Sequence, residues 1–303
     1  MEKSNRRDFL RLAGVAAAGL GAVGLSKVST AQAALENPAE KYKTIAIHAR
    51  QDAPVALVDQ VVENGVLRAG VDLTFPPLQF RDPSTNEPMG YCVDLTNAIA
   101  EDLGVTVEWV EMPFAELIPG LQAGQYDWSG IALTIRPQRA QAVRFISEPW
   151  FVEDSILLVN DDFKFTDANE LNDAAVTISN LTGSAQDASA KLRWPDATYR
   201  TFEALQDSLL EVATGRAQAS LVALWNAIPF MDENPDAPVH IWEGGSLFAD
   251  VNTVMLPHGD EKTAFWLDNW MRYHGAHKLQ DNLWTQWQGD NLQKLEEYSK
   301  PRQ

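Results

Sequence analysis

The sequence has very little cysteine and histidine. Cys92 is the only cysteine among 303 residues, and there are five histidines. A single cysteine cannot form a disulfide within the chain, and its apolar neighbours indicate a small buried residue. No group of cysteines and histidines has the spacing of a metal site, since His274 and His277 lie three residues apart with no third ligand nearby. We therefore expect neither a metal ion nor any other cofactor.

Basic residues and long apolar runs are also scarce. The chain has 24 lysines and arginines against 42 aspartates and glutamates, which gives a formal net charge of −18. Nucleic acids and anionic lipid surfaces repel such a chain, so neither is an expected partner. The apolar run from Leu12 to Leu25 covers about 14 residues, whereas a helix that spans a bilayer needs about 20.

That apolar run has the features of an export signal. It follows the basic residues Arg6 and Arg7 and precedes the segment Ala31-Gln32-Ala33, which is the order found in signal peptides. We expect residues 1–33 to be removed by cleavage after Ala33 and the mature protein to be periplasmic. The paired arginines resemble the twin-arginine signal for export in the folded state. Two neighbouring residues depart from that signal, so the general secretory route remains an alternative.

Strand and helix patterns alternate along most of the chain. An apolar strand at 66–71 is followed by a helix at 93–104, which ends at a glycine, and by a strand at 105–110. Strands that alternate with helices predict an α/β fold with mostly parallel sheets covered on both faces. The further predicted elements are helices at 115–123 and 202–214, strands at 127–133, 155–159, 175–178, 219–224 and 251–256, and two C-terminal helices whose tryptophans Trp266, Trp270, Trp284 and Trp287 should pack against the sheet.

The restart of this pattern near residue 155 indicates two lobes. The chain crosses from one lobe to the other near 154–159 and returns near 249–255. A cleft between two such lobes is a natural ligand site, and hinge closure is a natural mode of action. We expect an export signal at 1–33, an N-terminal extension at 34–63, a first lobe made of 64–154 and 250–303, and a second lobe at 155–249.

The stretch from Gly124 to Arg139 contains the clearest binding signal. It places the hydroxyl of Thr134 and the guanidinium of Arg139 between the end of a strand and the start of a helix. A guanidinium matches a carboxylate with two parallel hydrogen bonds, and free N–H groups at a helix start add anion-binding capacity. Pro76 and Pro77 fix a loop that holds Phe75 at the carboxyl end of the first strand, where parallel sheets bind ligands. The alternatives are an exposed surface loop for Arg139 and a core position for Phe75.

Five motifs in this order resemble the family 3 extracellular solute-binding proteins, which are the periplasmic polar amino-acid receptors of ABC importers. The resemblance extends over roughly residues 64–290 and implies the type II periplasmic-binding-protein fold, with two α/β lobes around a cleft. The motifs are Phe75-Pro76-Pro77-Leu78-Gln79-Phe80, Gly90-Tyr91-Cys92-Val93-Asp94-Leu95, the segment from Leu117 to Asp127, Thr134-Ile135-Arg136-Pro137-Gln138-Arg139, and Phe145-Ile146-Ser147-Glu148-Pro149-Trp150-Phe151.

The resemblance also implies roles for individual residues. Phe75 and Phe114 would be the aromatic walls on either side of the ligand, and Asp72 would lie near its amino group. Arg139 would pair with the ligand carboxylate. Further contacts with the ligand are implied for the backbone of Ala132, the N–H and hydroxyl of Thr134, the backbone N–H groups around Thr182, and Ser184.

One segment departs from the family pattern. The family commonly has an aspartate in the second lobe that binds the ligand's ammonium group, but this chain has Ala223 or Leu224 there. An ammonium group buried without a carboxylate is unfavourable. Either Asp72 and another acid replace the missing one, or the ligand is not an ordinary α-amino acid. Trp225 could then face a cation through its ring, and Asn226 could form a hydrogen bond.

The expected function is therefore capture of a small carboxylate-bearing ligand, an amino acid or a derivative, for delivery to an ABC transporter permease. We expect a monomer and no enzymatic activity. Two alternatives remain: an enzyme similar to cyclohexadienyl dehydratases, and the soluble component of a sensory system. An enzyme would need an acid or base in the cleft. The residues available for that role are Asp72, Glu148, Glu153 and His240.

Overall fold

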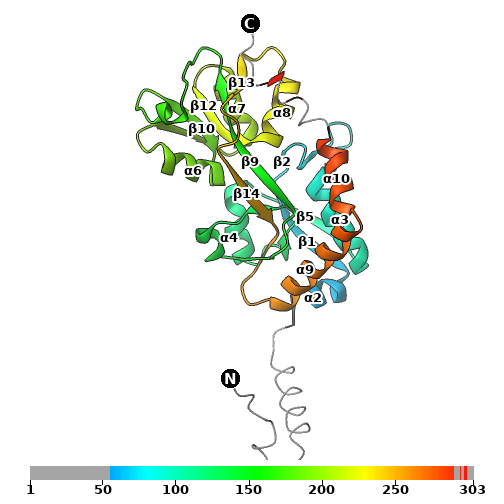
Figure 1. Cartoon of the computed structure of the whole chain (residues 1–303). Coiled ribbons are helices and arrows are strands. Elements are labelled where there is room, and N and C mark those ends of the chain that lie inside the picture. The colour runs from blue at the N-terminus through cyan, green and yellow to red at the C-terminus, as the bar shows by residue number, and fades with distance from the viewer. Residues whose placement is uncertain (1–54, 290–293, 295–296, 299–303) are drawn as a thin grey trace, which may run out of the picture. The chain divides into compact units, whose positions relative to one another are not determined.

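The computed structural model describes residues 55–289, 294, 297 and 298 (Figure 1). The expected signal peptide and most of the expected N-terminal extension lie outside the described residues. Within them, no helix has the length and apolarity required to cross a membrane. The described part begins with helix α2 (Leu57–Asn64), which buries Val58 and Val61.

A small parallel sheet forms the first layer. Strand β1 (Val66–Val71) lies in its centre, between β5 (Thr106–Glu111) and β6 (Trp128–Ser129). Every second residue of β1 is fully buried, as the apolar alternation predicts. Helix α3 (Tyr91–Leu103) contacts β5, and α4 (Leu117–Gln122) contacts β1 and β6. Gly104 ends α3 with a φ of 69°, a left-handed conformation that favours glycine.

A three-stranded antiparallel sheet carries Phe75. Strand β2 (Thr74–Phe75) pairs with β3 (Gln79–Arg81), which pairs with β4 (Pro88–Met89). Pro76 and Pro77 form the turn between β2 and β3, where neither proline needs to donate to the sheet. Phe75 therefore lies at the edge of a short hairpin just beyond the end of β1.

The larger sheet combines parallel and antiparallel strands. Its parallel part consists of β11 (Thr198–Phe202), β10 (Thr177–Leu181) and β12 (Ala219–Ala223). Strand β9 (Phe151–Asn160) continues the sheet in the antiparallel direction, and pairs with β12, β13 (Val239–Ile241) and β14 (Phe248–Thr253). Strand β7 (Leu133–Thr134) pairs with β14 at the edge of the sheet, so the strand order is β11-β10-β12-β9-β14-β7.

The predicted two-lobe α/β fold is confirmed. The larger sheet also contains antiparallel strand pairs, which the sequence analysis did not predict. Strands β9 and β14 run side by side from one α/β unit into the other (Figure 1), which is where the two crossings were expected. Their mutual pairing is antiparallel because the chain leaves the first lobe along β9 and returns along β14. The exact lobe boundaries stay a prediction.

Helices cover the second unit. Helices α6 (Ala185–Arg193) and α7 (Leu205–Ala213) both contact β10. Helix α8 (Leu224–Glu233) contains Pro229, and the sequence analysis did not predict it. Proline normally interrupts a helix, so Pro229 argues against a helix in this segment. Because α8 buries most of its side chains, it also lacks the polar face that marks a surface helix in a sequence.

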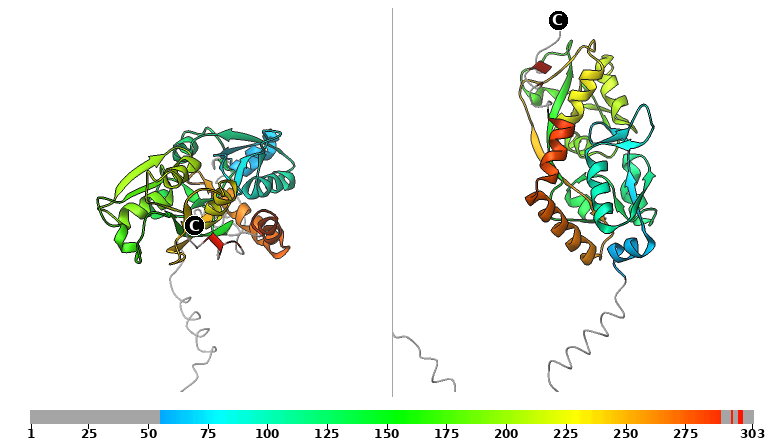
Figure 2. Two further views of the ribbon diagram at one scale, coloured as in Figure 1. Left: turned by 90° about the horizontal axis from the view of Figure 1, so that it is seen from above. Right: turned by 90° about the vertical axis from the view of Figure 1, so that its right-hand side faces the viewer.

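The tryptophans of the last two helices contact both strands and helix α3. Trp287 contacts Phe80 of β3, and Trp284 contacts Phe151 of β9. Helix α9 (Glu261–Ala276) follows the short pair β8 (Arg144–Phe145) and β15 (Met255–Leu256), and α10 (Leu279–Gln288) contacts α3. The indole nitrogens of Trp270 and Trp287 donate to Asp102 and Asp94 of α3, each at 2.7 Å. Figure 2 shows α9 and α10, coloured orange to red, along one side of the described part of the chain.

Candidate functional site

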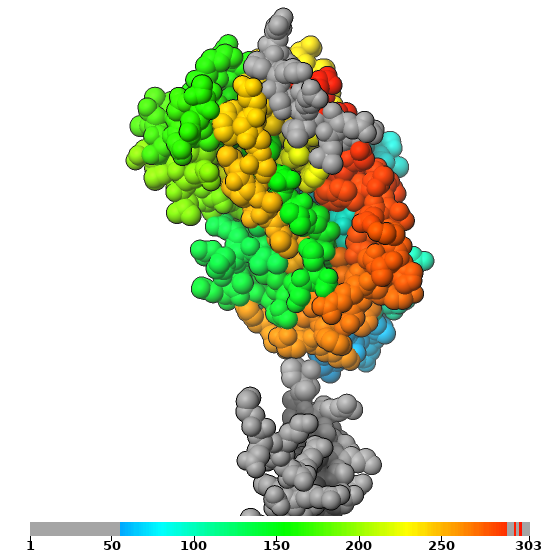
Figure 3. All heavy atoms as spheres, viewed as in Figure 1, coloured from blue at the N-terminus to red at the C-terminus, as the bar shows by residue number. Residues whose placement is uncertain are grey.

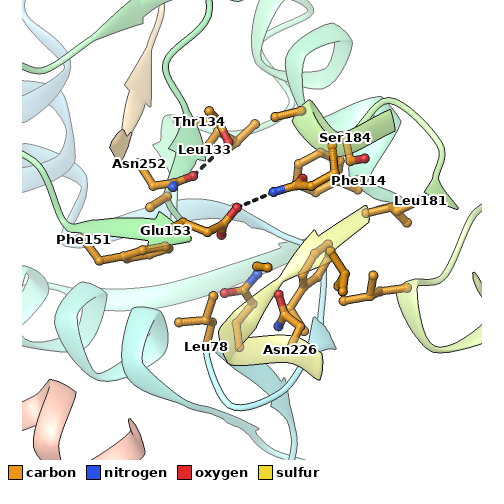
Figure 4. Close-up of a pocket in the computed structure, with 18 of the residues that line it drawn as sticks. Leu78, Phe114, Leu133, Thr134, Phe151, Glu153, Leu181, Ser184, Asn226 and Asn252 are labelled. Atoms are coloured by element: carbon orange, nitrogen blue, oxygen red, sulfur yellow. Dashed lines mark hydrogen bonds between the residues drawn. The ribbon is translucent and has the colours of Figure 1, made fainter. Parts of the chain in front are cut away.

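A pocket opens where the two α/β units meet. It contains about 550 Å³ of empty space, part of which is open to solvent, and is shown in Figure 4. On the outer surface, β9 and β14 lie beside each other next to this region (Figure 3). The first unit and the strands that join the units supply Phe75, Leu78, Gln79, Phe114, Ala132, Leu133, Thr134, Phe151, Glu153 and Asn252; the second unit supplies Leu181, Ser184, Ala185, Gln186, Leu205, Leu221, Val222, Ala223 and Asn226.

Two phenylalanines form an aromatic surface in this pocket. Phe75 ends β2, and Phe114 begins a short 3-10 helix (Phe114–Glu116) after Pro113. Their ring centroids are 5.4 Å apart at an interplanar angle of 41°. A flat ligand group between two rings needs about 7 Å, twice the van der Waals contact of about 3.5 Å. In this arrangement the two rings therefore touch each other and form one continuous surface.

Arg139 lies behind the aromatic surface and is not among the residues that line the pocket. Pro137 starts helix α5 (Pro137–Ala140), and this turn buries the Arg139 side chain with its guanidinium carbon 5.5 Å from the Phe114 ring centroid. Nη1 donates to the carbonyl oxygen of Thr134 at 3.1 Å, and Nη2 donates to that of Gly183 at 3.0 Å. Burial lowers the pKa of Arg139 to about 10, so the side chain remains charged at neutral pH.

The hydroxyl of Thr134 faces an amide that the sequence analysis missed. Thr134 Oγ1 donates to Asn252 Oδ1 at 3.1 Å, and both residues line the pocket beside Ala132. Asn252 lies on β14 and pairs with Thr134 on β7. Because 118 residues separate the two, no local sequence pattern connects them.

The second unit presents the start of α6 to the pocket. Ser184 caps this helix, and its hydroxyl accepts from the N–H of Asp187 at 2.9 Å. The N–H of Thr182 donates to Phe202, and that of Ser184 donates to Leu181. Both of these predicted ligand donors are thus used by the protein itself. Ser184 lines the pocket, whereas Thr182 is not among the lining residues.

The structure separates the neighbouring residues Trp225 and Asn226. Asn226 lines the pocket and donates from Nδ2 to the carbonyl oxygen of Pro76 at 3.1 Å, which links the two units. Trp225 points elsewhere, into a second pocket that Tyr91 and Trp150 also line. Its ring makes an edge contact with Trp284 at 5.1 Å. The expected contact between Trp225 and a ligand cation in the cleft gains no support from this position.

Asp72 is also withdrawn from the pocket. Its side chain is buried, and Oδ1 accepts from both the N–H of Thr74 at 3.0 Å and the hydroxyl of Thr74 at 2.6 Å. Burial raises the pKa of Asp72, and the hydrogen bonds from Thr74 and the N–H of Phe114 oppose this increase. Asp72 is not among the lining residues, so a direct contact with a ligand would need a rearrangement.

Glu153 is the only ionisable residue that lines the pocket in the described part of the chain. It lies on β9, where Phe151, Glu153 and Ser155 alternate toward the buried side. Gln186 of α6 donates to Glu153 Oε1 at 2.5 Å and to the Ser155 hydroxyl at 3.2 Å. Burial raises the pKa of Glu153 to about 7. The sequence analysis had considered Glu153 only as a possible acid of an enzyme.

The sequence matches one protein family over most of its length. Residues 67–290 match the bacterial extracellular solute-binding proteins, family 3. The chain belongs to this family. Its described residues contain no group of three or more histidine, cysteine or acidic side chains able to hold a metal ion.

Individual relatives include amino-acid-binding proteins. The L-arginine-binding protein of Pseudomonas aeruginosa is 26% identical over 160 residues, which cover 50% of this chain and 59% of the relative. The chain thus spans less than two thirds of that protein.

This chain covers almost the whole length of two similar solved structures. A mutant of ArgBP from T. maritima superimposes with a TM-score of 0.69 at 27% identity, over 76% of this chain and 98% of that one. The ancestral amino acid-binding protein AncCDT-1, a precursor of cyclohexadienyl dehydratase, gives a TM-score of 0.68 at 28% identity over the same shares. Both support the two-lobe fold described above.

Proposed function

We propose that this protein is a periplasmic solute-binding protein that captures an amino acid or a related small carboxylate and delivers it to an ABC transporter permease. Family membership and the amino-acid-binding relatives support this function. The observation that carries the proposal is a buried arginine beside an aromatic surface in a pocket between two lobes. Export with removal of residues 1–33 belongs to the same proposal, and N-terminal sequencing of the mature protein tests it.

Arg139 is the proposed partner of the ligand carboxylate. A guanidinium has five N–H donors, and the structure assigns two of them to the carbonyl oxygens of Thr134 and Gly183. Within the described part of the chain, no carboxylate forms an ion pair with Arg139. Glu153 and Asp250 favour its charge only from a distance. Burial still disfavours the cation, so a ligand carboxylate in direct contact would stabilise it. Because Gly183 belongs to the second unit, the same side chain would connect ligand binding to lobe closure.

The test compares Arg139 variants in ligand binding. Purified protein is screened by thermal shift against amino acids, opines, betaines and small carboxylates, and each hit is measured by calorimetry. We expect Arg139→Ala to weaken binding at least about 30-fold, since removing one member of a buried charge pair costs about 2–5 kcal/mol. Arg139→Lys keeps the charge without the planar fork and should fall between the two. Arg144→Ala is the matched control, because Arg144 pairs with Glu261 outside the pocket. Wild-type affinity in Arg139→Ala would disprove the assignment.

A catalytic alternative has one supporting observation, the likeness to the precursor of a dehydratase. Of the four acids and bases considered from the sequence, only Glu153 lines the pocket. His240 instead contacts Asp161 through Nδ1 at 2.7 Å, and Glu148 pairs with Arg272. Binding without turnover is therefore the favoured function. Incubation of the purified protein with prephenate or arogenate, followed by product analysis, tests the alternative.

A further inference from the structure

Glu153 is a buried carboxylate whose direct contacts in the described structure are uncharged. It is 7% exposed, and its hydrogen-bond partner is the neutral amide of Gln186. No lysine, arginine or histidine of the described residues forms an ion pair with it. Burying a carboxylate without a counter-charge is unfavourable, so a cation that entered this pocket would be stabilised there.

The charged groups around Glu153 include both acids and arginines. Asp250 lies opposite Glu153 in the β9–β14 pair, and Asp154 follows it in β9. Both carboxylates, when ionised, disfavour the charge on Glu153, whereas Arg139 favours it. The Cys92 thiol of α3 is the remaining titratable group close enough to interact with Glu153, and burial raises the pKa of that thiol to about 12, so it stays neutral. Asp250 is also close to Arg136 and Arg139, which favour its ionised form. The side chain of Asp154 points to the opposite face of β9 and accepts from Ser246. The attraction for a positive ligand group therefore comes from Glu153 itself, which is buried beside a neutral amide.

Gln186 fixes where such a group would bind. Its amide donates to Glu153 Oε1 and to the Ser155 hydroxyl, so it holds the carboxylate against β9 from the second unit. Figure 4 shows Glu153 pointing into the pocket, with a hydrogen bond to a side chain across it. Arg139 lies on the side of the pocket formed by Phe114 and Thr134. Glu153 therefore lines the pocket directly, whereas Arg139 lies behind the Phe114 ring and is not among the lining residues.

We propose that Glu153, oriented by Gln186, binds a cationic nitrogen of the ligand in place of the second-lobe aspartate that this chain lacks. This inference rests on the proposed function, and it adds the residue that recognises the positive end of the ligand. Glu153 takes this role because the second unit supplies no ionisable side chain to the pocket.

Binding of a cation should also release a proton. The pKa of Glu153 lies at about 7, so about half of the empty molecules hold a proton there at pH 7. A bound cation favours the carboxylate and expels that proton. Calorimetry at pH 7 in buffers of different ionisation enthalpy measures the number released. We expect about half a proton for the wild type and none from this site in Glu153→Gln.

The decisive experiment measures the affinities of three probes at pH 7.5 by calorimetry. L-Glutamine carries an α-ammonium group only, 5-guanidinopentanoate carries a guanidinium only, and L-arginine carries both. We expect Glu153→Gln to weaken the preferred probe at least about 30-fold. The probe most affected shows which nitrogen Glu153 binds. The control is Asp154→Asn, which removes the neighbouring carboxylate of the same strand; Asp154 accepts from Ser246 outside the pocket and should leave affinity within about twofold.

The outcomes separate the two proposals. If the wild type binds at least one probe and Glu153→Gln binds it as well as Asp154→Asn does, the role of Glu153 is wrong and the proposed function stands. If folded wild-type protein binds none of the probes or other carboxylates, the proposed function fails and this inference fails with it. Circular dichroism and the unfolding midpoint show whether Glu153→Gln is folded. Glu153→Asp, which keeps the charge on a shorter side chain, should retain proton release while losing part of the affinity.

Discussion

The unusual environment of Glu153 predicts a measurable dependence of stability on pH. Burial raises its pKa from the ordinary value of 4.5 to about 7, while in the unfolded chain the ordinary value returns. Between these two pH values the native protein holds a proton that the unfolded chain has released. Raising the pH through this window therefore favours unfolding. The contribution is absent below about pH 4.5 and complete above about pH 7.

The size of the effect follows from the two pKa values. Each pH unit of difference corresponds to about 1.4 kcal/mol, so the interval from 4.5 to about 7 amounts to about 3 kcal/mol. Glu153→Gln keeps an oxygen that can accept from Gln186 but removes the titration. We expect the variant to match the wild type near pH 4.5 and to exceed its free energy of unfolding by about 3 kcal/mol at pH 8. Burial also raises the pKa of Asp72, which is common to both proteins and cancels in the comparison. Asp250 interacts with Glu153, so the measured difference includes the coupling between these two acids.

The assay is urea unfolding of both proteins at a series of pH values. The protein must first be unfolded and refolded to remove any ligand, because a bound ligand adds stability of its own. Tryptophan fluorescence and circular dichroism should give the same midpoint, which shows that one free energy describes the transition. A difference between the two proteins that stays within 1 kcal/mol from pH 4.5 to pH 8 would refute the reasoning, and so would a difference that grows toward acid pH.

Two further predictions concern the aromatic residues. Phe114→Leu keeps an apolar side chain but loses the contacts of the ring with Phe75 and Arg139. Ligand affinity should therefore fall about three- to tenfold, for a loss of about 0.5–1.5 kcal/mol. Calorimetry checks this with Phe80→Leu as the control outside the pocket, and equal affinities of the two variants would contradict the prediction. Trp284→Ala removes ring contacts with Tyr91, Phe151 and Trp225. It should lower the free energy of unfolding, measured by urea unfolding, by about 2–4 kcal/mol. Phe265→Ala is the control: this side chain is 70% exposed, so the free energy of unfolding should change by about 0.5 kcal/mol or less. Similar losses in the two variants would contradict this prediction.

The elements that the sequence predicted well are those with a strong local pattern. The expected strand at 66–71 is β1 itself, because Leu67, Ala69 and Val71 alternate with less buried residues. Helix α3 was predicted from apolar spacing and the glycine that ends it. Helix α8 was missed because Pro229 and an almost wholly buried surface hide the helical period. The directions of β9 and β14 depend on pairing between residues about a hundred positions apart, which no local pattern records.

The same limitation explains what was missed in the pocket. Six of the ten residues that the sequence placed in the site line the pocket: Phe75, Phe114, Ala132, Thr134, Ser184 and Asn226. The other four, Asp72, Arg139, Thr182 and Trp225, do not line it. Whether any of these residues contacts a ligand stays a prediction. Glu153 was not assigned to binding because the strand was predicted to begin at Ser155, after two acidic residues. In the structure β9 begins at Phe151, and pairing with β14 buries Glu153 despite its charge.

These observations together connect stability with ligand choice. A carboxylate that destabilises the empty protein above pH 7 has no structural advantage over glutamine at the same position, since Gln186 could bond to either. The disadvantage is removed only when something positive enters the pocket. If Glu153 binds a cationic nitrogen, the bound ligand offsets a cost that exists only in the ionised state, so the stabilisation by ligand should be larger at pH 8 than at pH 5. An uncharged ligand would show no such dependence through Glu153. The pH profile of stability and the pH profile of binding therefore test one physical cause from two directions.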